Sequence, residues 1–185
     1  MRPQKVEDLQ VLKGFISVFR AKGYEGASLN ELAAASGLKK ASLYHRFPGG
    51  KKEMALAVLN YIEEWIEKNI YGVLVDSTKP EKERIEMVVK NINDLYSGGV
   101  ESCMFRSLSL DLGIALFGKE IKRGTELWIK GFLIFGMEIG MPKDSAAELA
   151  SQSYIDIQGS LVLSKSIGTT VPFLKALKKI EKAYS

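Results

Sequence analysis

The chain has 185 residues, of which 46% are apolar, enough to build a hydrophobic core and to exclude an intrinsically disordered protein. Its single cysteine, Cys103, excludes an internal disulfide and fits a reducing cytoplasm. No apolar run approaches the ~20 residues of a membrane span, and the N-terminus lacks the apolar stretch of a signal peptide. We therefore expect a cytoplasmic protein without a membrane partner.

The net charge of +4 is distributed unevenly along the chain. Residues 1–52 carry ten Lys/Arg and four Asp/Glu, a net charge of +6, whereas residues 53–185 carry 16 basic and 18 acidic residues, a net charge of −2. A basic segment on a slightly acidic body is typical of a domain that meets phosphate. Solvated lysine faces are common, so this charge is informative only together with a motif in the same segment.

The first predicted helix covers residues 5–22 and ends before Gly23. Its expected apolar stripe recurs at helical spacing and consists of Leu9, Leu12, Ile16, Phe19 and, alongside them, Phe15. Residues 1–5 before it are either a basic arm that reaches the minor groove of DNA or a frayed terminus.

Two short helices joined by a glycine turn are predicted next, between Ser28 and Phe47. Ser28 and Glu31 have the spacing of a capping box, and Gly37 suits a left-handed helix stop. In the second helix, Leu43 and Phe47 share one face, which leaves the polar residues Lys39, Lys40, Ser42, Tyr44 and His45 to point elsewhere. Such a pair of helices indicates a helix-turn-helix that reads DNA.

The rest of the chain is also predicted to be helical. The expected elements are a long helix over residues 51–70, a loop over 72–79, a helix over 80–96, two short pieces over 103–118, a long helix over 119–141, and two final helices over 142–166 and 170–183. We therefore predict an all-α protein. An N-terminal three-helix helix-turn-helix domain would occupy residues 1–52, and a larger helical domain residues 53–185.

The run SLNELAAASGLKKASLYHRFPGGKKEM, residues 28–54, resembles the DNA-binding domain of the TetR family of transcriptional repressors. The matching residues are Ser28, Ala35-Ser36-Gly37-Leu38, Leu43-Tyr44-His45-Arg46-Phe47 and Lys51. The variant Pro48-Gly49-Gly50-Lys51 is similar to the LmrA/YxaF-type branch of that family. Two positions depart from the family pattern: Lys39 stands where a capping Ser is common, and Ala41 where Gly, Pro or Thr is frequent.

This resemblance implies a ligand-responsive repressor that binds a palindromic operator in double-stranded DNA as a homodimer. The C-terminal helices, residues 143–166 and 170–183, would form a four-helix dimer interface. A pocket within residues 53–142 would bind a small, apolar or aromatic effector that releases the protein from its operator. A constitutive DNA-binding dimer without an effector is the alternative.

The candidate DNA contacts lie on the second short helix and at two helix starts. The Tyr44 phenol can donate to a phosphate oxygen, with a core aromatic as the alternative. Lys40 at the start of the recognition helix can reach guanine O6/N7, with a solvated surface as the alternative. Lys51 and Ser28 lie at helix N-termini, which favour phosphate, although Ser28 can also be only a cap. The full predicted set is Ser28, Lys39, Lys40, Ala41, Ser42, Tyr44, His45 and Lys51.

Two further sets are predicted in the larger domain, and each has plain core packing as its alternative. The candidate effector contacts are the aromatic residues Trp65, Tyr96, Phe105, Trp128, Phe132 and Phe135. The candidate dimer contacts are Tyr154, Ile157, Leu161, Phe173, Leu177 and Ile180. Arg106 and Glu138 either anchor a ligand or reach solvent, and Cys103 is expected to be a small buried hydrophobe.

The sequence does not favour an enzyme. Nucleophilic chemistry would need Cys103 or a serine together with His45, yet His45 lies inside the DNA-binding motif. As the only histidine, it also cannot build a metal site, and no phosphate loop or dinucleotide fingerprint is present. We therefore predict a non-enzymatic regulator with no metal and no cofactor.

Overall fold

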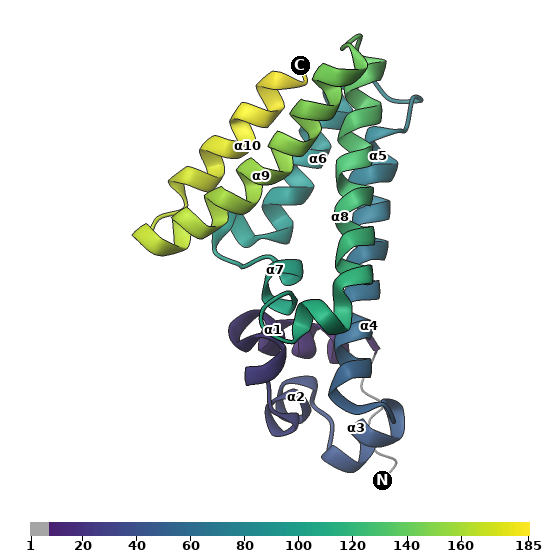
Figure 1. Ribbon diagram of the computed structural model, residues 1–185, viewed down its shortest axis with the longest axis vertical. Coiled ribbons are helices and arrows are strands. Elements are labelled where there is room, and N and C mark those ends of the chain that lie inside the picture. The colour runs from purple at the N-terminus through teal and green to yellow at the C-terminus, as the bar shows by residue number, and fades with distance from the viewer. Residues whose placement is uncertain (1–7) are drawn as a thin grey trace. The chain divides into compact units, whose positions relative to one another are not determined.

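The computed structural model describes residues 8–185, and every regular element in that range is a helix (Figure 1). The α-helices are α1 (Asp8–Gly26), α2 (Leu29–Ser36), α3 (Lys40–Arg46), α4 (Gly50–Ile66), α5 (Gly72–Leu74), α6 (Glu81–Leu95), α7 (Met104–Leu108), α8 (Gly113–Glu138), α9 (Lys143–Ile167) and α10 (Val171–Ala183). A π-helical turn, η1 (Glu67–Tyr71), and a 3-10 turn, η2 (Ser97–Gly99), complete the set. The predicted all-α fold is confirmed, whereas the predicted basic arm at residues 1–5 lies outside the described residues.

The helices group into two units. The first consists of Met1–Ile62, described from residue 8 onward, and Met104–Lys122; the second consists of Glu63–Cys103 and Arg123–Ser185. Because α4 and α8 contribute residues to both units, the chain passes between them within continuous helices. The functional division at residue 52 stays a prediction. None of the helices formed by residues 8–185 is long and apolar enough to cross a membrane.

In the first unit, α1 packs against α2 and α7, with a buried face that consists of Val11, Gly14, Phe15, Val18 and Phe19. The stripe predicted from the sequence is therefore partly wrong: Leu9 is exposed, and Leu12 and Ile16 are only half-buried. The reason is the close approach of α2 at Gly14. A Cβ on Gly14 would overlap the Ala35 carbonyl and come within 2.7 Å of the Ser36 nitrogen. This contact turns the face of α1 that contains Gly14 inward.

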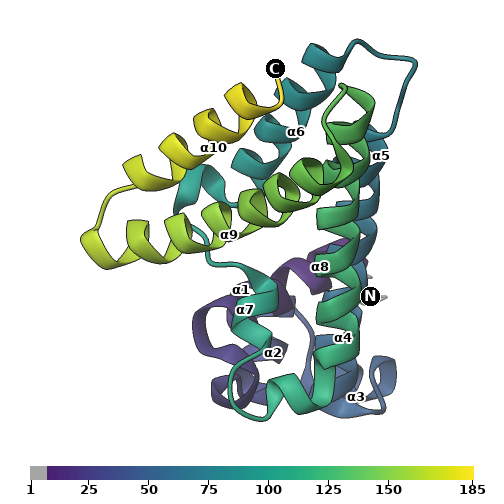
Figure 2. The same ribbon diagram turned by 45° about the horizontal axis from the view of Figure 1, so that its top comes forward.

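In the second unit, α9 and α10 lie side by side as a hairpin, and α10 also contacts α6 (Figure 2). Every third or fourth residue of α9 is buried, from Ala146 through Ile157 to Ser164. Phe173, Leu177 and Ile180 give α10 one buried face. This spacing is that of amphipathic helices packed on a shared core.

An ion pair between the buried Arg84 and the exposed Glu138 joins α6 to α8 in the second unit. Arg84 donates two hydrogen bonds to the Glu138 carboxylate, at 2.6 Å and 3.0 Å, and a third to the Leu74 carbonyl at 2.7 Å. Its guanidinium also lies over the Phe135 ring, 4.9 Å from the ring centroid. Hydrogen bonding to Arg84 holds the pKa of Glu138 below its usual value. Of the two polar residues considered as ligand anchors, Glu138 is therefore engaged in this pair, and Arg106 reaches solvent.

Several helix boundaries differ from the prediction. Helix α1 continues to Gly26, past its predicted end before Gly23, and Gly72–Leu74, predicted as part of a loop, is the short helix α5. The second short piece expected within residues 103–118 is the first part of α8, which begins at Gly113 instead of near residue 119. The long helix expected over residues 51–70 is present, but it passes from α4 into the π-helical turn η1. At η1, the Asn91 Nδ2 of α6 donates to the Asn69 carbonyl at 2.8 Å, and Asn69 Nδ2 donates to the Trp65 carbonyl of α4 at 2.9 Å. These side-chain hydrogen bonds satisfy backbone carbonyls at the π-helical turn. Hydrophobic periodicity in the sequence gives no signal for such a turn.

Replacing Gly14 with Ala should destabilise the protein, because the added methyl group overlaps the Ala35–Ser36 peptide. Over-packing of this kind costs about 1–3 kcal/mol. Gly118→Ala is the matched control in α8 of the same unit, since a Cβ there meets only Ile114 Cδ1, at 3.8 Å. The higher helix propensity of Ala should make that control more stable by up to ~1 kcal/mol. Urea unfolding followed by circular dichroism measures both. Equal effects of the two substitutions would contradict a close contact at Gly14.

Candidate nucleic-acid interface

The N-terminus of α2 is fixed by a capping box, as the sequence predicts. The Glu31 amide donates to Ser28 Oγ at 3.3 Å, and the Ser28 amide donates to Glu31 Oε2 at 3.1 Å. Lys22 from α1 forms an ion pair with the same carboxylate. The Lys22 bond, followed by those from Ser28, lowers the pKa of Glu31 from its usual 4.5 to about 2.

The turn after α2 sets where α3 starts. Gly37 has φ 70°, a left-handed conformation that glycine adopts at no steric cost, and its amide donates to the Ala34 carbonyl at 3.2 Å. The Leu38 amide donates to the Ala33 carbonyl at 3.1 Å. The predicted glycine stop is therefore confirmed. At the other end of the turn, Lys39 caps α3 without a side-chain hydrogen bond, which is the consequence of its departure from the family's Ser.

Helix α3 is attached to the unit by apolar residues and by an ion pair between Arg46 and Asp8 of α1. Leu43 is buried, and the Phe47 ring that follows α3 meets the Phe15 ring edge-on, with centroids 5.3 Å apart. The remaining predicted contacts on this segment are all exposed: Lys39, Lys40, Ala41, Ser42, Tyr44 and His45, which we call the α3 surface. Tyr44 is 47% exposed, so the alternative of a core aromatic does not hold.

The Lys51 side chain is turned toward its own subunit. Its ammonium donates to the carbonyls of Glu25 and Ala27 at 3.2 Å and 3.0 Å and lies 4.6 Å from the Tyr24 ring centroid. Lys51 thereby ties the start of α4 to the connection between α1 and α2. Its neighbour Lys52, which the sequence analysis missed, is the exposed lysine at this helix start. The only sequence signal for Lys52 was that a second lysine follows the first.

The six candidate effector contacts do not form one cluster. Phe105 belongs to the first unit and the other five to the second. In the second unit, the rings of Phe132 and Phe135 pack on Tyr184, with centroids 5.3 Å and 5.9 Å apart. Tyr96 and Trp128 lie elsewhere in that unit, each near Tyr154, and Trp65 is half-buried.

The candidate dimer contacts lie inside the subunit, which is the alternative that the sequence left open. Five of them are buried: Ile157, Leu161, Phe173, Leu177 and Ile180. The sixth, Tyr154, packs on Trp128 and shares a hydrogen bond with Thr125 at 3.3 Å. The α9–α10 hairpin instead exposes a different apolar set, which the sequence analysis missed: Ile155, Val162, Leu163, Ile167, Val171 and Leu174.

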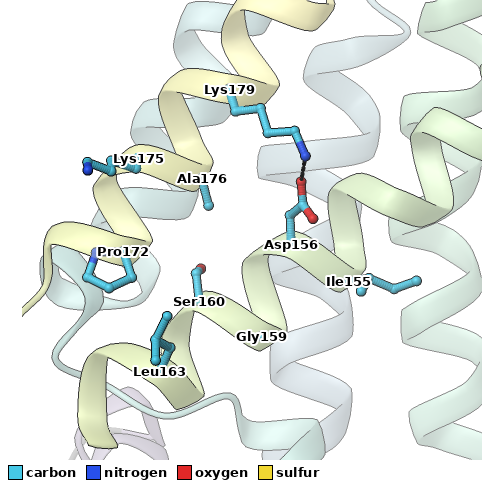
Figure 3. Close-up of a pocket in the computed structure, with 9 residues that line it drawn as sticks. All are labelled: Ile155, Asp156, Gly159, Ser160, Leu163, Pro172, Lys175, Ala176 and Lys179. Atoms are coloured by element: carbon cyan, nitrogen blue, oxygen red, sulfur yellow. Dashed lines mark hydrogen bonds and ion pairs between the residues drawn. The ribbon is translucent and has the colours of Figure 1, made fainter. Parts of the chain in front are cut away.

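An open groove of about 420 Å³ runs between α9 and α10 (Figure 3). It is lined from α9 by Ile155, Asp156, Gly159, Ser160 and Leu163, and from α10 by Pro172, Lys175, Ala176 and Lys179. Lys179 donates to Asp156 across it at 2.7 Å. None of the six candidate effector contacts lines this groove. Within residues 8–185, no three His, Cys, Asp or Glu side chains gather as a metal site would require.

Comparison with known proteins agrees with this geometry. Residues 12–58 match the family model of bacterial regulatory proteins, tetR family. The HTH-type transcriptional regulator LmrA of Bacillus subtilis (strain 168) is 25% identical over 174 residues, which cover 89% of each chain. The regulator YxaF of the same organism is 27% identical over 168 residues, 88% of this chain and 87% of the relative. A solved complex of the TetR family regulator CifR, a cysteine mutant, with 26-bp operator DNA has a TM-score of 0.73 at 20% identity and covers 100% of both chains.

A glycine-turn helix pair whose second helix presents lysine, serine, tyrosine and histidine to solvent defines a helix-turn-helix DNA-binding protein. The chain is a DNA-binding transcriptional regulator whose helix-turn-helix segment matches the tetR family of bacterial regulatory proteins. Its relatives are regulators rather than enzymes, which confirms the prediction of a non-enzymatic protein. The predicted likeness to LmrA and YxaF is confirmed as well.

The capping box should make stability fall on acidification. Since the folded-state pKa of Glu31, about 2, is below its usual 4.5, its carboxylate stabilises the fold above pH 4.5, and this contribution is lost as the pH falls toward 2. Glu31→Gln should therefore lose less stability than the parent over this window. Glu25→Gln, an exposed carboxylate outside the capping box, should behave like the parent. Denaturant midpoints measured from about pH 6 to about pH 2 test this. Identical pH profiles for the parent and Glu31→Gln would contradict it.

Proposed function

We propose that the chain is a repressor that binds a pseudo-palindromic operator as a homodimer and is released by a small effector. The observation that carries the proposal is the exposure of the whole α3 surface while only Leu43 of α3 is buried. A helix held in this way can enter a major groove with its polar side chains toward the bases. The protein would act in the bacterial cytoplasm, beside the chromosome.

Each side chain of the α3 surface suits a different kind of contact. Lys40, in the first turn, is placed to reach guanine O6/N7, with Lys39, Ala41 and Ser42 beside it. Tyr44 and His45 suit phosphate oxygens, which set the register without reading sequence. At the helix starts, Ser28 and the exposed Lys52 suit backbone phosphates. We assign Lys51 a supporting role, because its ammonium already bonds two carbonyls within the subunit.

The homodimer is supported by the outer face of the α9–α10 hairpin. Ile155, Gly159, Leu163 and Ile167 follow one another at four-residue spacing and form one exposed ridge along α9. Glycine within a helix costs ~1 kcal/mol relative to alanine, and a Cβ on Gly159 would meet nothing within 4 Å. Packing within the subunit therefore does not require a glycine at position 159. A helix of a second copy that packs closely on this ridge does require a small residue there, because ridges at i±4 spacing interdigitate between helices.

Effector release would require the two recognition helices to change spacing. On straight DNA, half-sites recur about 34–36 Å apart, so a small change in the dimer breaks the fit. Helix α4 is the candidate element for transmitting this change, since its residues belong to both units. A coupling of about 1–3 kcal/mol between effector and operator is sufficient.

A constitutive DNA-binding dimer is the second candidate. It is favoured by the packing of Phe132 and Phe135 on Tyr184, which makes two of the predicted effector contacts part of an ordinary core. The two candidates differ in one measurement. A screen of metabolites and drugs for loss of operator binding yields active compounds only for the ligand-responsive version.

Two substitutions on the α3 surface should weaken operator binding in different ways. Lys40→Ala should cost about 1–3 kcal/mol, relax base preference and lower the salt slope of binding by about 1 per site. Tyr44→Phe should weaken binding to every sequence equally, because it removes a phosphate contact. The assay is fluorescence anisotropy, as a function of salt, on DNA selected from a random library.

Lys82→Ala is the control, because it removes the same charge from an exposed position on α6 of the second unit. Its affinity, base preference and salt slope should match those of the parent. If Lys40→Ala binds DNA with the same affinity, base preference and salt slope as the control, α3 does not contact the bases.

Replacing Leu163 with Lys should convert the dimer to a folded monomer. Leu163 is 49% exposed on the α9 ridge, so the charge is solvated in the monomer but buried without a partner in the dimer. Ile114→Lys is the control, with an apolar residue of similar exposure, 53%, in the first unit. Sedimentation velocity at micromolar concentration distinguishes the two states. A parent protein that sediments as a monomer, or a Leu163→Lys variant that remains dimeric, would contradict this interface.

A further inference from the structure

One side chain joins the two ends of the helix-turn-helix. Helix α2 begins directly after its cap at Ser28, and α4 begins at Gly50, shortly after the end of α3. Lys51, in the first turn of α4, donates at 3.0 Å to the carbonyl of Ala27, the residue before that cap. The same ammonium donates to the Glu25 carbonyl at 3.2 Å. Because Ala27 precedes α2 and Lys51 follows α3, this contact connects the entry of the motif to its exit.

The Tyr24 ring is the third partner of this ammonium. Lys51 Nζ lies 4.6 Å from the ring centroid, within the range of a cation–π interaction. Tyr24 is half-buried, and burial raises the pKa of its phenol, so the ring is neutral at neutral pH. A lysine side chain is flexible, and two carbonyls and an aromatic face together restrict its ammonium to one position.

Other elements of the first unit fix the position of Tyr24. Its ring meets the Phe117 ring of α8 edge-on, with centroids 5.0 Å apart, and stacks on Phe19 of α1, with centroids 6.4 Å apart. Directly before it, Gly23 has φ 67°, a conformation that favours glycine, and an added Cβ would lie 3.2 Å from the Ser107 carbonyl oxygen of α7. Tyr24 therefore connects α7 and the first part of α8 to the start of α4.

The three partners of Lys51 are electrically neutral, so they do not cancel its charge. A lysine at a helix N-terminus is also suited to bind phosphate. The two roles exclude each other, because an ammonium that bonds a phosphate has to leave the carbonyls and the ring. They also differ in their dependence on Tyr24, since only a lysine that joins the ends of the motif needs the ring.

We propose that Tyr24 is a positioning residue for DNA binding, because its ring keeps Lys51 on the Glu25 and Ala27 carbonyls and so fixes α2 and α3 between α1 and α4. Neither Tyr24 nor Lys51 then touches DNA. This inference rests on the proposed entry of α3 into the major groove. Its consequence is that a residue outside the α3 surface, in the connection between α1 and α2, sets operator affinity.

The test measures fluorescence anisotropy, as a function of salt, on DNA selected from a random library. Tyr24→Leu and Lys51→Met should each weaken binding by about three- to tenfold, as the loss of a partly desolvated cation–π contact predicts. The double variant should bind no more weakly than the weaker of the two single variants, because both substitutions break one contact. The salt slope should stay that of the parent in all three, since no phosphate contact is lost. Tyr24→Phe keeps the ring and should bind as the parent does.

A second lysine–tyrosine contact provides the matched control. In the second unit, the Lys130 ammonium lies 5.4 Å from the Tyr71 ring centroid. Tyr71→Leu removes this ring and should leave DNA affinity and salt slope unchanged. Circular dichroism melting of all variants checks that each is folded under the conditions of the binding assay.

An NMR measurement on the full-length protein tests the ring contact without DNA. Ring current should shift the Lys51 ε-methylene protons upfield in the parent and in Tyr24→Phe, and this shift should be lost in Tyr24→Leu. A parent without the upfield shift would overturn the inference, whether or not the variants fold.

Four binding results would also overturn it. They are parent-like binding by Tyr24→Leu, additive losses in the double variant, equal losses in Tyr24→Leu and Tyr71→Leu, and a salt slope lowered by about 1 per site in Lys51→Met, which indicates a phosphate contact. If the parent binds no selected DNA, the proposed function fails, while the NMR shifts still decide whether the Tyr24 ring holds Lys51.

Discussion

The contact between α1 and α2 at Gly14 is the constraint on which the DNA-binding unit depends. Because Gly14 has no side chain, the Ala35–Ser36 peptide comes against the α1 backbone, and this fixes the end of α2. The turn at Gly37 then sets the start of α3, while Phe15 on α1 contacts Phe47 at its end. Because apolar packing and the Arg46–Asp8 ion pair hold α3 in place, the residues of the α3 surface stay exposed.

Some basic residues of the N-terminal segment are bonded within the subunit, and others are exposed to solvent. Lys51 bonds two carbonyls, Lys22 pairs with Glu31, and Arg46 pairs with Asp8. Lys39, Lys40 and Lys52 are exposed. The net charge of this segment therefore overstates the positive charge that is left unpaired on its surface. Lys51, which bonds carbonyls at the α1–α2 connection, instead holds the start of α4 in place.

The sequence predicted the helix-turn-helix in detail, because its signals are local. The capping pair Ser28 and Glu31, the stop at Gly37 and the inward Leu43 each act within one helical turn, and the structure has all three. The predicted dimer residues had no such local signal. Helix α9 carries two apolar sets, one through Ile157 and Leu161 and another through Ile155 and Leu163, and periodicity alone does not tell which one the subunit covers.

By itself, then, the sequence determined an all-helical chain, the position of the helix-turn-helix and its likeness to the tetR family, since capping, turn chemistry and helical periodicity act over a few residues. Only the tertiary structure decided which face of α1 is buried, that Lys51 turns inward, that Phe105 belongs to the first unit, and that the apolar set through Ile155 and Leu163 is the exposed one on α9. Those outcomes depend on contacts between residues far apart in the chain, where backbone approach at a glycine or the distance to a carbonyl decides which side chain is covered and which donor is paired.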